Sequence, residues 1–311
     1  MKLTHLRDIT AVAERGSLRA AARHLGVAQP AITRSIREIE RELGVALFER
    51  RPKGIVLTPM GELFLKRATT VLGELRRARE EIDQVRGLTT GKVDIALSSA
   101  AQISLFPHTL EPFRKRYPDV SLVIRDGLFP NIEPLLKDGE IDFYVGPLPE
   151  LAPAKEFIVE KLFDNTRMVL GRKGHPLAKA RSLRDLADAR WIGTSVTVER
   201  GAEFSPIFER YGLAKPVVEM HLMSTLAITL AAAHSDLLIL VPEQWLNFAP
   251  VAEKLTVFPI QEPLPAAPIC IVTRARLPLT PAAQFFADLF RRASLYYLRE
   301  RQEKRRKRPA K

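Results

Sequence analysis

The sequence predicts an α/β protein in which a small helical head precedes a larger body of alternating strands and helices. Apolar residues recur with helical spacing through residues 3–43 and 59–85, whereas short apolar runs of strand length alternate with helix-length segments from residue 91 onwards. We expect a head over residues 1–58, a linker helix over 59–88, a body over 89–298 and a disordered basic tail over 299–311. The body, at roughly 200 residues, suits one domain with two lobes.

The head contains two short helices joined by a tight turn. The segment "SLRAAARHLGV" offers Ser17 as an N-cap, a helix of small residues that ends at Leu25, and Gly26 as the turn. In "AQPAITRSIREIERELG", Pro30 suits the first helical position and Gly44 the residue past the end. The apolar residues of this second helix recur at i, i+4, i+7 and i+11, and so share one core-facing stripe: Ile32, Ile36, Ile39 and Leu43.

A preceding helix over residues 3–13, with its own apolar face, completes a three-helix core. In a helix-turn-helix unit the second helix enters the major groove of DNA with its N-terminus leading. The residues that would then meet DNA lie off the core stripe: Gln29, Pro30, Thr33, Arg34 and Arg37. Glutamine can pair with adenine and arginine with guanine, whereas an isolated charged stripe would indicate only a solvated surface.

The next segment, "ALFERRPKGIVL", predicts a short hairpin, or wing. Its basic turn places Arg51 and Lys53 within reach of phosphate or of an adjacent minor groove; a solvated loop is the alternative. Thr58 and Pro59 then begin a helix that runs to about Val85. Its apolar stripe predicts pairing with the same helix of a second chain, in a homodimer or homotetramer: Leu63, Ala68, Val71, Leu75, Ala78 and Ile82.

Positive charge is concentrated at the two ends of the chain. The net charge is +12; residues 1–88 carry 17 lysines and arginines against 11 acidic residues, and residues 299–311 carry 8 against 2. The body between them has 23 of each. A basic head on a neutral body indicates double-stranded DNA as the partner of the head, because phosphate neutralisation supplies much of the affinity. The basic tail either adds weak, salt-sensitive DNA affinity or is solvated without a role.

Four segments carry a resemblance to a known family: "GSLRAAARHLGVAQPAITRSIREIERELGVALFER", "LTPMGELFL", "FRKRYPDVSLVIRDG" and "GEIDFYVGP". They are similar to LysR-type bacterial transcriptional regulators over nearly the whole chain. The resemblance implies base contacts from Gln29, Pro30, Thr33 and Arg34, phosphate contacts from Ser17 and Arg37, and a wing contact from Lys53. It also implies RNA polymerase as a further partner. The wing tip "RPKG" is less basic than in many members.

Seven short apolar runs of the body read as strands: 92–97, 120–124, 141–145, 167–170, 217–220, 237–241 and 268–273. Helix-length segments separate most of them, which favours parallel βα units. We expect the chain to cross between two lobes near Asp164 and to return near Ala266. Lobe I then comprises residues 91–164 and 267–298, and lobe II residues 165–266. The family resemblance implies a periplasmic-binding-protein-like fold.

Ligands of open α/β sheets bind beyond the carboxyl ends of strands and near helix N-termini. That rule selects the following effector-binding candidates: Ser98, Ser99, Gln102, Gly127, Leu128, Phe129, Gly146, Thr194, Ser195, Thr197, Ser224 and Thr225. Clustered hydroxyls and free N–H groups favour a small organic anion, although serine and threonine also serve simply as helix caps. Leu128, Phe129 and Met223 suggest an aromatic effector. "VIRDGLFP" and "AHSDLLILVP" most resemble regulators of aromatic sulfonate (p-toluenesulfonate) degradation.

The sequence contains none of the common catalytic or nucleotide-binding motifs, such as G-x-x-x-x-G-K-[ST], H-E-x-x-H or G-x-S-x-G, so we expect neither an enzyme nor a bound cofactor. The six histidines lack the spacing of a metal site. Cys270, the single cysteine, lies in an apolar run and suggests a buried thiol; an intramolecular disulfide switch, known in one branch of the family, would need a second cysteine.

Two functions remain: a ligand-responsive transcriptional regulator, and an architectural DNA-binding protein whose body serves only oligomerisation. A cleft rich in hydroxyls favours the first. No run is long and apolar enough to span a membrane, and an amphipathic helix in place of a signal peptide opens the chain, so we expect a cytoplasmic protein.

Overall fold

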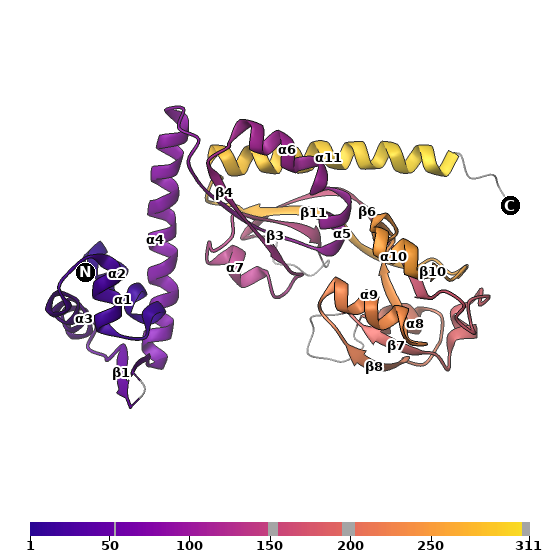
Figure 1. Cartoon of the computed structure of the whole chain (residues 1–311), viewed down its shortest axis with the longest axis horizontal. Helices are drawn as coiled ribbons and strands as arrows, with labels where there is room; N and C mark the ends of the chain where they lie inside the picture. Colours follow the sequence, from indigo (N-terminus) through magenta and orange to yellow (C-terminus); the bar gives the residue numbers. More distant parts are fainter. Residues whose placement is uncertain (53, 149–154, 195–202, 307–311) are drawn as a thin grey trace. The chain divides into compact units, whose positions relative to one another are not determined.

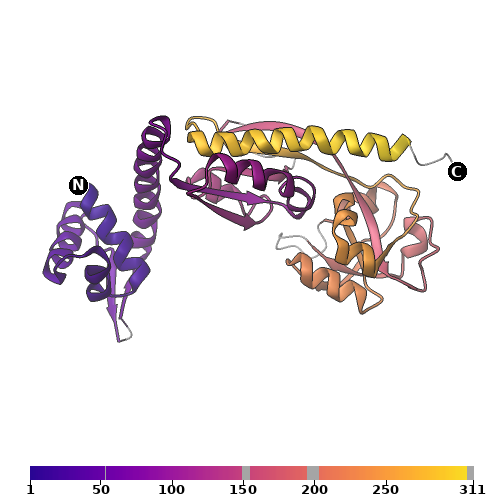
Figure 2. The same cartoon turned by 45° about the horizontal axis from the view of Figure 1, so that its top comes forward.

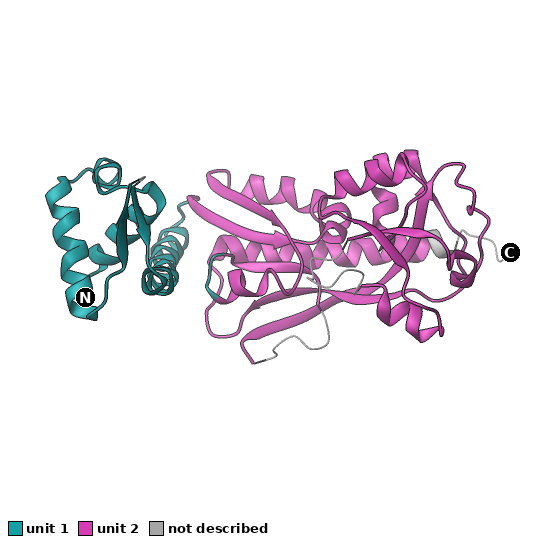
Figure 3. Ribbon diagram, turned by 90° about the horizontal axis from the view of Figure 1, so that it is seen from below, with its two compact units in different colours: residues 1–88, 138–140 teal, residues 89–137, 141–311 magenta. Residues whose placement is uncertain are grey.

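A computed structural model describes residues 1–52, 54–148, 155–194 and 203–306 of the chain, with side chains to residue 303. The chain divides into two compact units, which are coloured separately in Figure 3. Unit 1 comprises residues 1–88 with 138–140, and unit 2 comprises residues 89–137 with 141–311. The two units are described separately below.

Unit 1 begins with three helices, α1 (Leu3–Arg15), α2 (Leu18–Leu25) and α3 (Gln29–Leu43), labelled in Figure 1. The Ser17 hydroxyl caps α2 by accepting a hydrogen bond from the Ala20 N–H at 3.1 Å. Gly26 ends α2 with a φ of 66°, a left-handed conformation that glycine adopts without strain. The predicted helix-turn-helix is confirmed, with α3 starting one residue earlier than expected, so that Pro30 is its second residue.

The core of unit 1 lies where these helices cross. Its buried residues come from all three helices and from the chain before the wing: Ile9, Ala11, Val12, Ala21, Ala22, Ile32, Ile36, Ile39 and Leu47. The prediction that Leu43 also faces this core is wrong, since its side chain is 39% exposed. Leu43 is the last residue of α3, and the small core ends one turn earlier, at Ile39.

The wing and the linker helix are also confirmed. Strands β1 (Phe48–Arg51) and β2 (Gly54–Leu57) pair antiparallel, with Phe48 opposite Leu57. Helix α4 (Pro59–Val85) follows, and the Thr58 hydroxyl caps it by accepting from the Gly61 N–H at 3.0 Å. Gly61 lies against the chain before the wing, because a Cβ there would sit 2.0 Å from the Leu47 carbonyl oxygen. This contact fixes the start of α4 on the three-helix core.

Unit 2 is built on a sheet of nine strands within the described residues, in the order β4-β3-β5-β11-β6-β9-β7-β8 with β10 beside β6 (Figure 1). In chain order the strands are β3 (Gly91–Leu97), β4 (Val120–Asp126), β5 (Phe143–Pro147), β6 (Phe157–Arg172), β7 (Arg190–Gly193), β8 (Val217–His221), β9 (Leu238–Pro242), β10 (Leu255–Val257) and β11 (Pro265–Arg274). Strands β3 to β5 belong to lobe I, and β7 to β10 to lobe II. Two lobes were predicted, and this is confirmed.

The two lobes are joined by β6 and β11, which are antiparallel to each other. The first part of β6 pairs with β11, and its continuation, from Arg167, pairs with β9. Asn165 lies opposite Ala266, so the expected crossing near residues 164 and 266 is found. The expectation of parallel pairing holds within each lobe but fails here, because a chain that crosses to the second lobe and returns must run in both directions.

Helices cover both faces of the sheet in each lobe. In lobe I, α5 (Ser99–Ser104), α6 (Pro107–Arg116) and the long α11 (Pro281–Arg306) cover one face, and α7 (Glu133–Lys137) the other. Figure 2 shows α11 lying along α6. In lobe II, the 3₁₀ turn η1 (Leu183–Leu186) and α8 (Ser205–Arg210) pack on one core, whereas α9 (Thr225–Ala233), the 3₁₀ turn η2 (Glu243–Asn247) and α10 (Ala249–Lys254) pack on another.

The expectation of a disordered tail is wrong for residues 299–306, which continue helix α11. This segment is rich in arginine, glutamate and lysine, which are good helix formers. Arg301 also anchors it, by an ion pair with Glu243 and a hydrogen bond to the Asp164 carbonyl at 3.1 Å. Strands β7 and β10 and the first half of β6 were not predicted. Among the described helices, none has the length and apolar character needed to cross a membrane.

Candidate nucleic-acid interface and ligand pocket

Helix α3 exposes the residues that the sequence assigns to DNA. Gln29, Pro30, Arg34 and Arg37 are exposed, and Thr33 is half-buried with its hydroxyl donating to the Gln29 carbonyl at 3.2 Å. Within the described chain, neither Arg34 nor Arg37 forms an ion pair. Both guanidinium groups are therefore available to an outside anion such as DNA.

The acidic residues of α3 are held within unit 1. Glu38 Oε2 lies 3.4 Å from Nε2 of His5, and Glu42 pairs with the amino terminus of Met1 at 2.7 Å. Glu40 accepts backbone hydrogen bonds from Leu47 at 2.8 Å and Phe48 at 3.2 Å. Because these carboxylates are occupied by the protein itself, they leave the arginines of the helix unneutralised.

The wing provides less than the sequence suggested. Arg51 donates to Glu49 on the same strand at 2.5 and 2.9 Å, in an exposed pair that a phosphate could replace at little cost. Lys53 lies outside the described residues. Arg50, which the sequence analysis did not select, is exposed and has no ion pair within the described part of the chain. Arg50 and Arg51 are adjacent in the sequence, and nothing in the local pattern indicated which of them would contact DNA.

Helix α4 carries an exposed apolar stripe. Leu63, Val71, Leu75 and Ile82 are all exposed, whereas Ala68 packs inwards. Exposure of large apolar side chains at helical spacing is typical of a surface that another chain covers.

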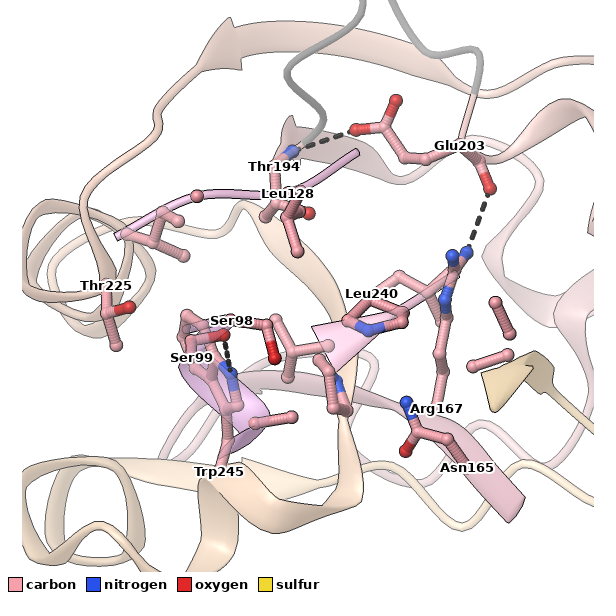
Figure 4. A pocket seen from close by; sticks show the side chains of 18 of the residues that line it. Ser98, Ser99, Leu128, Asn165, Arg167, Thr194, Glu203, Thr225, Leu240 and Trp245 are labelled. Atoms are coloured by element: carbon pink, nitrogen blue, oxygen red, sulfur yellow. Dashed lines mark hydrogen bonds between the residues drawn. The ribbon is translucent and has the colours of Figure 1, made fainter. Parts of the chain in front are cut away.

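Unit 2 contains a cavity of ≈ 330 Å³ between its two lobes (Figure 4). Seven of the effector-binding candidates line it: Ser98, Ser99, Gly127, Leu128, Phe129, Thr194 and Thr225. Ser98 is placed there by pairing of β3 with β5, since its N–H donates to the Val145 carbonyl at 2.9 Å. The rule that ligands bind beyond strand ends therefore selected residues from both lobes, and the fold brings these residues to one cavity.

Three of the candidates are not among the lining residues. Gln102 donates its amide to Leu97 and Asp126, and Ser224 caps α9. Gly146 permits close packing behind the cavity, where a Cβ would lie 2.8 Å from that of Ser98. Ser195 and Thr197 lie outside the described residues.

Sequence reasoning missed the charged, amide and indole side chains of the pocket: Asp126, Asn165, Arg167, Glu203 and Trp245. Asn165 and Arg167 lie on the crossing strand β6, away from the carboxyl ends of strands where the search was made. The one available signal was an arginine at the start of an apolar strand, in "RMVL".

Arg167 is the cationic side chain among the described lining residues. Its Nη1 donates to the Glu203 backbone carbonyl at 3.1 Å (Figure 4). Burial lowers the pKa of Arg167 and the nearby Glu203 carboxylate opposes this, but an arginine side chain remains charged in a protein. The guanidinium has five N–H donors, which leaves several for a ligand.

Three further side chains of the pocket have their oxygen atoms occupied. Ser98 Oγ accepts from the Ala101 N–H at 3.3 Å, and Ser99 Oγ accepts from Trp245 Nε1 at 3.0 Å. Asn165 Oδ1 accepts from the Thr166 N–H at 3.0 Å. Each therefore retains an O–H or N–H group with which to donate to a ligand.

Two carboxylates, those of Glu203 and Asp126, also lie at the pocket, and one oxygen of each accepts a side-chain or backbone hydrogen bond. Glu203 Oε1 accepts from the Thr194 N–H at 2.8 Å. Partial burial raises the pKa of Asp126, although hydrogen bonds from Gln102 and the Gly127 backbone oppose the rise. The pocket therefore combines one half-buried cation with two carboxylates and several donors.

A winged helix-turn-helix that exposes unpaired arginines, joined to a two-lobed domain with a buried pocket, defines a DNA-binding regulator with a ligand domain. Residues 3–62 match the bacterial regulatory helix-turn-helix protein, lysR family, and residues 86–294 match the LysR substrate binding domain. The chain belongs to the LysR family of transcriptional regulators.

Relatives extend over almost the full chain. The HTH-type transcriptional regulator TdcA of Escherichia coli is 24% identical over 296 residues, which are 95% of this chain and 94% of that protein. The transcriptional dual regulator GltC of Bacillus subtilis is 28% identical over 301 residues, 93% of this chain and 96% of that protein. These relatives are regulators of transcription rather than enzymes.

Solved structures share the fold. Full-length CbnR complexed with its target DNA has a TM-score of 0.69 at 22% identity, covering 94% of this chain and 100% of that one. Full-length OxyR from Pseudomonas aeruginosa has a TM-score of 0.67 at 25% identity, covering 94% of this chain and 98% of that one. The two-lobed α/β body with an N-terminal helix-turn-helix is therefore a LysR architecture.

Proposed function

We propose that this LysR-family regulator reads its operator with α3 and responds to a small organic anion, aromatic in character, held between the lobes of unit 2. Gln29, Thr33 and Arg34 contact bases, and Ser17, Arg37 and the wing contact the backbone. The exposed stripe of α4 pairs two chains into a dimer, from which a tetramer can form. The protein acts in the cytoplasm, and its regulatory output reaches RNA polymerase.

The observation that carries the anion is the set of donors in the pocket. Arg167 supplies a half-buried positive charge, and Ser98, Ser99 and Asn165 supply O–H and N–H donors. A ligand with acceptor oxygens, such as a carboxylate or sulfonate, satisfies all of them, whereas a cation would leave them unpaired.

The aromatic part rests on the apolar wall. Leu128, Phe129, Met223, Ile228 and Leu240 line the same cavity. A ring fits beside these side chains while its acidic group faces β6. A sulfonate is one member of this class, in keeping with the likeness of "VIRDGLFP" and "AHSDLLILVP" to regulators of aromatic sulfonate breakdown.

Calorimetry on the full chain tests the proposal with benzoate, p-toluenesulfonate and an aliphatic dicarboxylate as probes. At least one aromatic acid should bind, and Arg167→Gln should weaken that binding by roughly ten- to a hundredfold, the range for a hydrogen bond to a charged group. Ser98→Ala and Thr194→Ala should each weaken it by about 0.5 to 3 kcal/mol. Arg190→Gln, which removes an exposed arginine of lobe II, is the matched control and should have no effect.

Binding of a cation or a neutral sugar in place of every anion would overturn the ligand assignment. The architectural alternative, in which the body serves only oligomerisation, predicts that no ligand raises the melting temperature of the protein. The half-buried Arg167 speaks against that alternative, since partial desolvation of a charged group that faces a cavity brings no advantage to a scaffold.

A further inference from the structure

Three consecutive residues of turn η2 in lobe II each contact lobe I. Glu243 forms an ion pair with Arg301 of α11, and the Gln244 amide donates to the Tyr297 hydroxyl at 3.2 Å. Trp245 Nε1 donates to Ser99 Oγ at 3.0 Å, as Figure 4 shows. We call these six residues the lobe clamp. Its Trp245 and Ser99 line the ligand pocket, whereas the other four do not.

The α11 side of the clamp is buried and polar. Gln244 is completely buried, and the Tyr297 ring packs against Phe163 in a tilted arrangement with a centroid distance of 4.8 Å. Burial raises the pKa of Tyr297, and the neighbouring Glu243 carboxylate raises it further. Arg301 also donates to the Asp164 carbonyl at 3.1 Å, on the strand that joins the lobes. Tyr297 and Arg301 of α11 therefore contact both η2 and β6, the strand that joins the lobes.

The bond between Trp245 and Ser99 depends on the position of η2. Trp245 has a single donor, its indole N–H, and this residue is buried, so loss of the serine oxygen would leave a buried donor unsatisfied. Helix α5, which starts at Ser99, packs directly on η2. A small displacement of η2 therefore changes both the pocket wall and the direction of the Ser99 hydroxyl.

We propose that Tyr297 and Arg301 are positioning residues of the ligand pocket, which act by holding η2 so that Trp245 fixes the Ser99 hydroxyl. Arg301, which the sequence analysis assigned to a basic tail, thereby contributes to the ligand domain. The effect of these two residues on effector binding rests on the proposed function, but the coupling between α11 and the pocket does not.

Hydrogen exchange on the full chain without ligand tests the coupling. The reporters are two amides at the clamp: Phe248, which donates to the Trp245 carbonyl at 3.0 Å, and Gln102, which donates to the Ser98 carbonyl at 2.9 Å. Tyr297→Phe and Arg301→Gln should each raise exchange around both by about tenfold or more. The core strand β7 should keep its protection in both variants, which shows that lobe II remains folded.

Matched controls lie on the same helix. Tyr296→Phe removes the hydroxyl of an exposed neighbour, and Arg299→Gln removes an exposed charge that forms no ion pair among the described residues. Both should leave exchange at residues 98–104 and 243–248 unchanged. If Tyr297→Phe proves too unstable to measure, Arg301→Gln tests the same step from the less buried side of the clamp.

A second readout follows Trp245 directly. Trp191 and Trp245 are the two tryptophans of the chain and both are buried, so acrylamide should quench the wild type weakly. Clamp variants should show a severalfold rise in quenching of part of the emission, and Ser99→Ala combined with Tyr297→Phe should add little to either change alone. Additive effects, or unchanged exchange and quenching in both clamp variants, would overturn the coupling. If no anion binds, the proposed ligand is wrong, but the coupling between α11 and the pocket is not contradicted.

Discussion

Glu40 Oε1 accepts a hydrogen bond from the backbone N–H of Leu47 at 2.8 Å, and this contact joins α3 to the chain just before the wing. Arg34 and Arg37 of the same helix stay exposed without an ion pair in the described chain. The charges of α3 that remain available to a partner are therefore determined by which of its charged residues the domain uses in internal contacts.

Arg34→Ala should separate base reading from general charge attraction. We expect a loss of about 1 to 3 kcal/mol on the operator with little change on unrelated DNA, because a bidentate base contact discriminates by that amount. Arg41→Ala, at the far end of the same helix, is the control and should weaken both DNAs slightly and alike. Fluorescence anisotropy at fixed salt measures all four affinities, and equal losses on both DNAs for Arg34→Ala would rule out base reading.

Leu75→Glu should dissociate the dimer. Leu75 is 38% exposed in the single chain, and pairing with a second α4 would bury the new carboxylate without a partner. Thr69→Glu introduces the same charge on an exposed position about a third of a turn around the helix from Leu75 and should leave assembly intact. Light scattering gives the mass of each, and an unchanged mass for Leu75→Glu would exclude α4 as the dimer surface.

The two glycines of α4 should respond to alanine with opposite signs. Gly61→Ala places a Cβ 2.0 Å from a backbone carbonyl, so the start of α4 must move and unit 1 should lose more than 1 kcal/mol. Gly73→Ala meets its nearest neighbour, an arginine nitrogen, at 3.6 Å and should gain about 0.5 to 1 kcal/mol from helix propensity. Urea unfolding followed by circular dichroism compares them; stabilisation by Gly61→Ala would contradict the close contact.

Protonation of Asp94 should make unit 2 less stable at acidic pH. Burial raises its pKa, but hydrogen bonds from Arg125 and Lys92 outweigh this and hold the pKa of Asp94 below its usual value. A group with a depressed folded pKa contributes stability above its unfolded pKa of about 4, and that stability is lost as the pH falls through the folded pKa.

Asp94→Asn should therefore cost about 1 to 3 kcal/mol at pH 7 and flatten the fall in stability below pH 5. Asp164→Asn, which alters an exposed pair with Lys161, is the control and should do neither. Unfolding curves between pH 3 and 7 supply the comparison. A wild-type and an Asp94→Asn protein with parallel pH profiles would show that Asp94 does not carry this dependence.

Local signals in the sequence were sufficient for the elements of unit 1 and for about a third of the residues that line the pocket. Ser17, Gly26 and the isoleucine stripe of α3 act within a few residues, and strand ends brought Ser98 and Thr194 to one cavity. Arg167 was missed because its role follows from β6 crossing between lobes, and Arg301 because its partner Glu243 is distant in sequence. Contacts between residues that are distant in sequence cannot be predicted from the local pattern of residue types.

The most direct measurement compares the footprint of the full chain on operator DNA with and without the anion that calorimetry identifies, in the wild type and in Arg167→Gln. We predict that the anion changes the length or internal cleavage pattern of the wild-type footprint, and that Arg167→Gln gives the ligand-free pattern under both conditions. A wild-type footprint that the bound anion leaves unaltered, or an equal change in Arg167→Gln, would contradict regulation of DNA binding through this pocket.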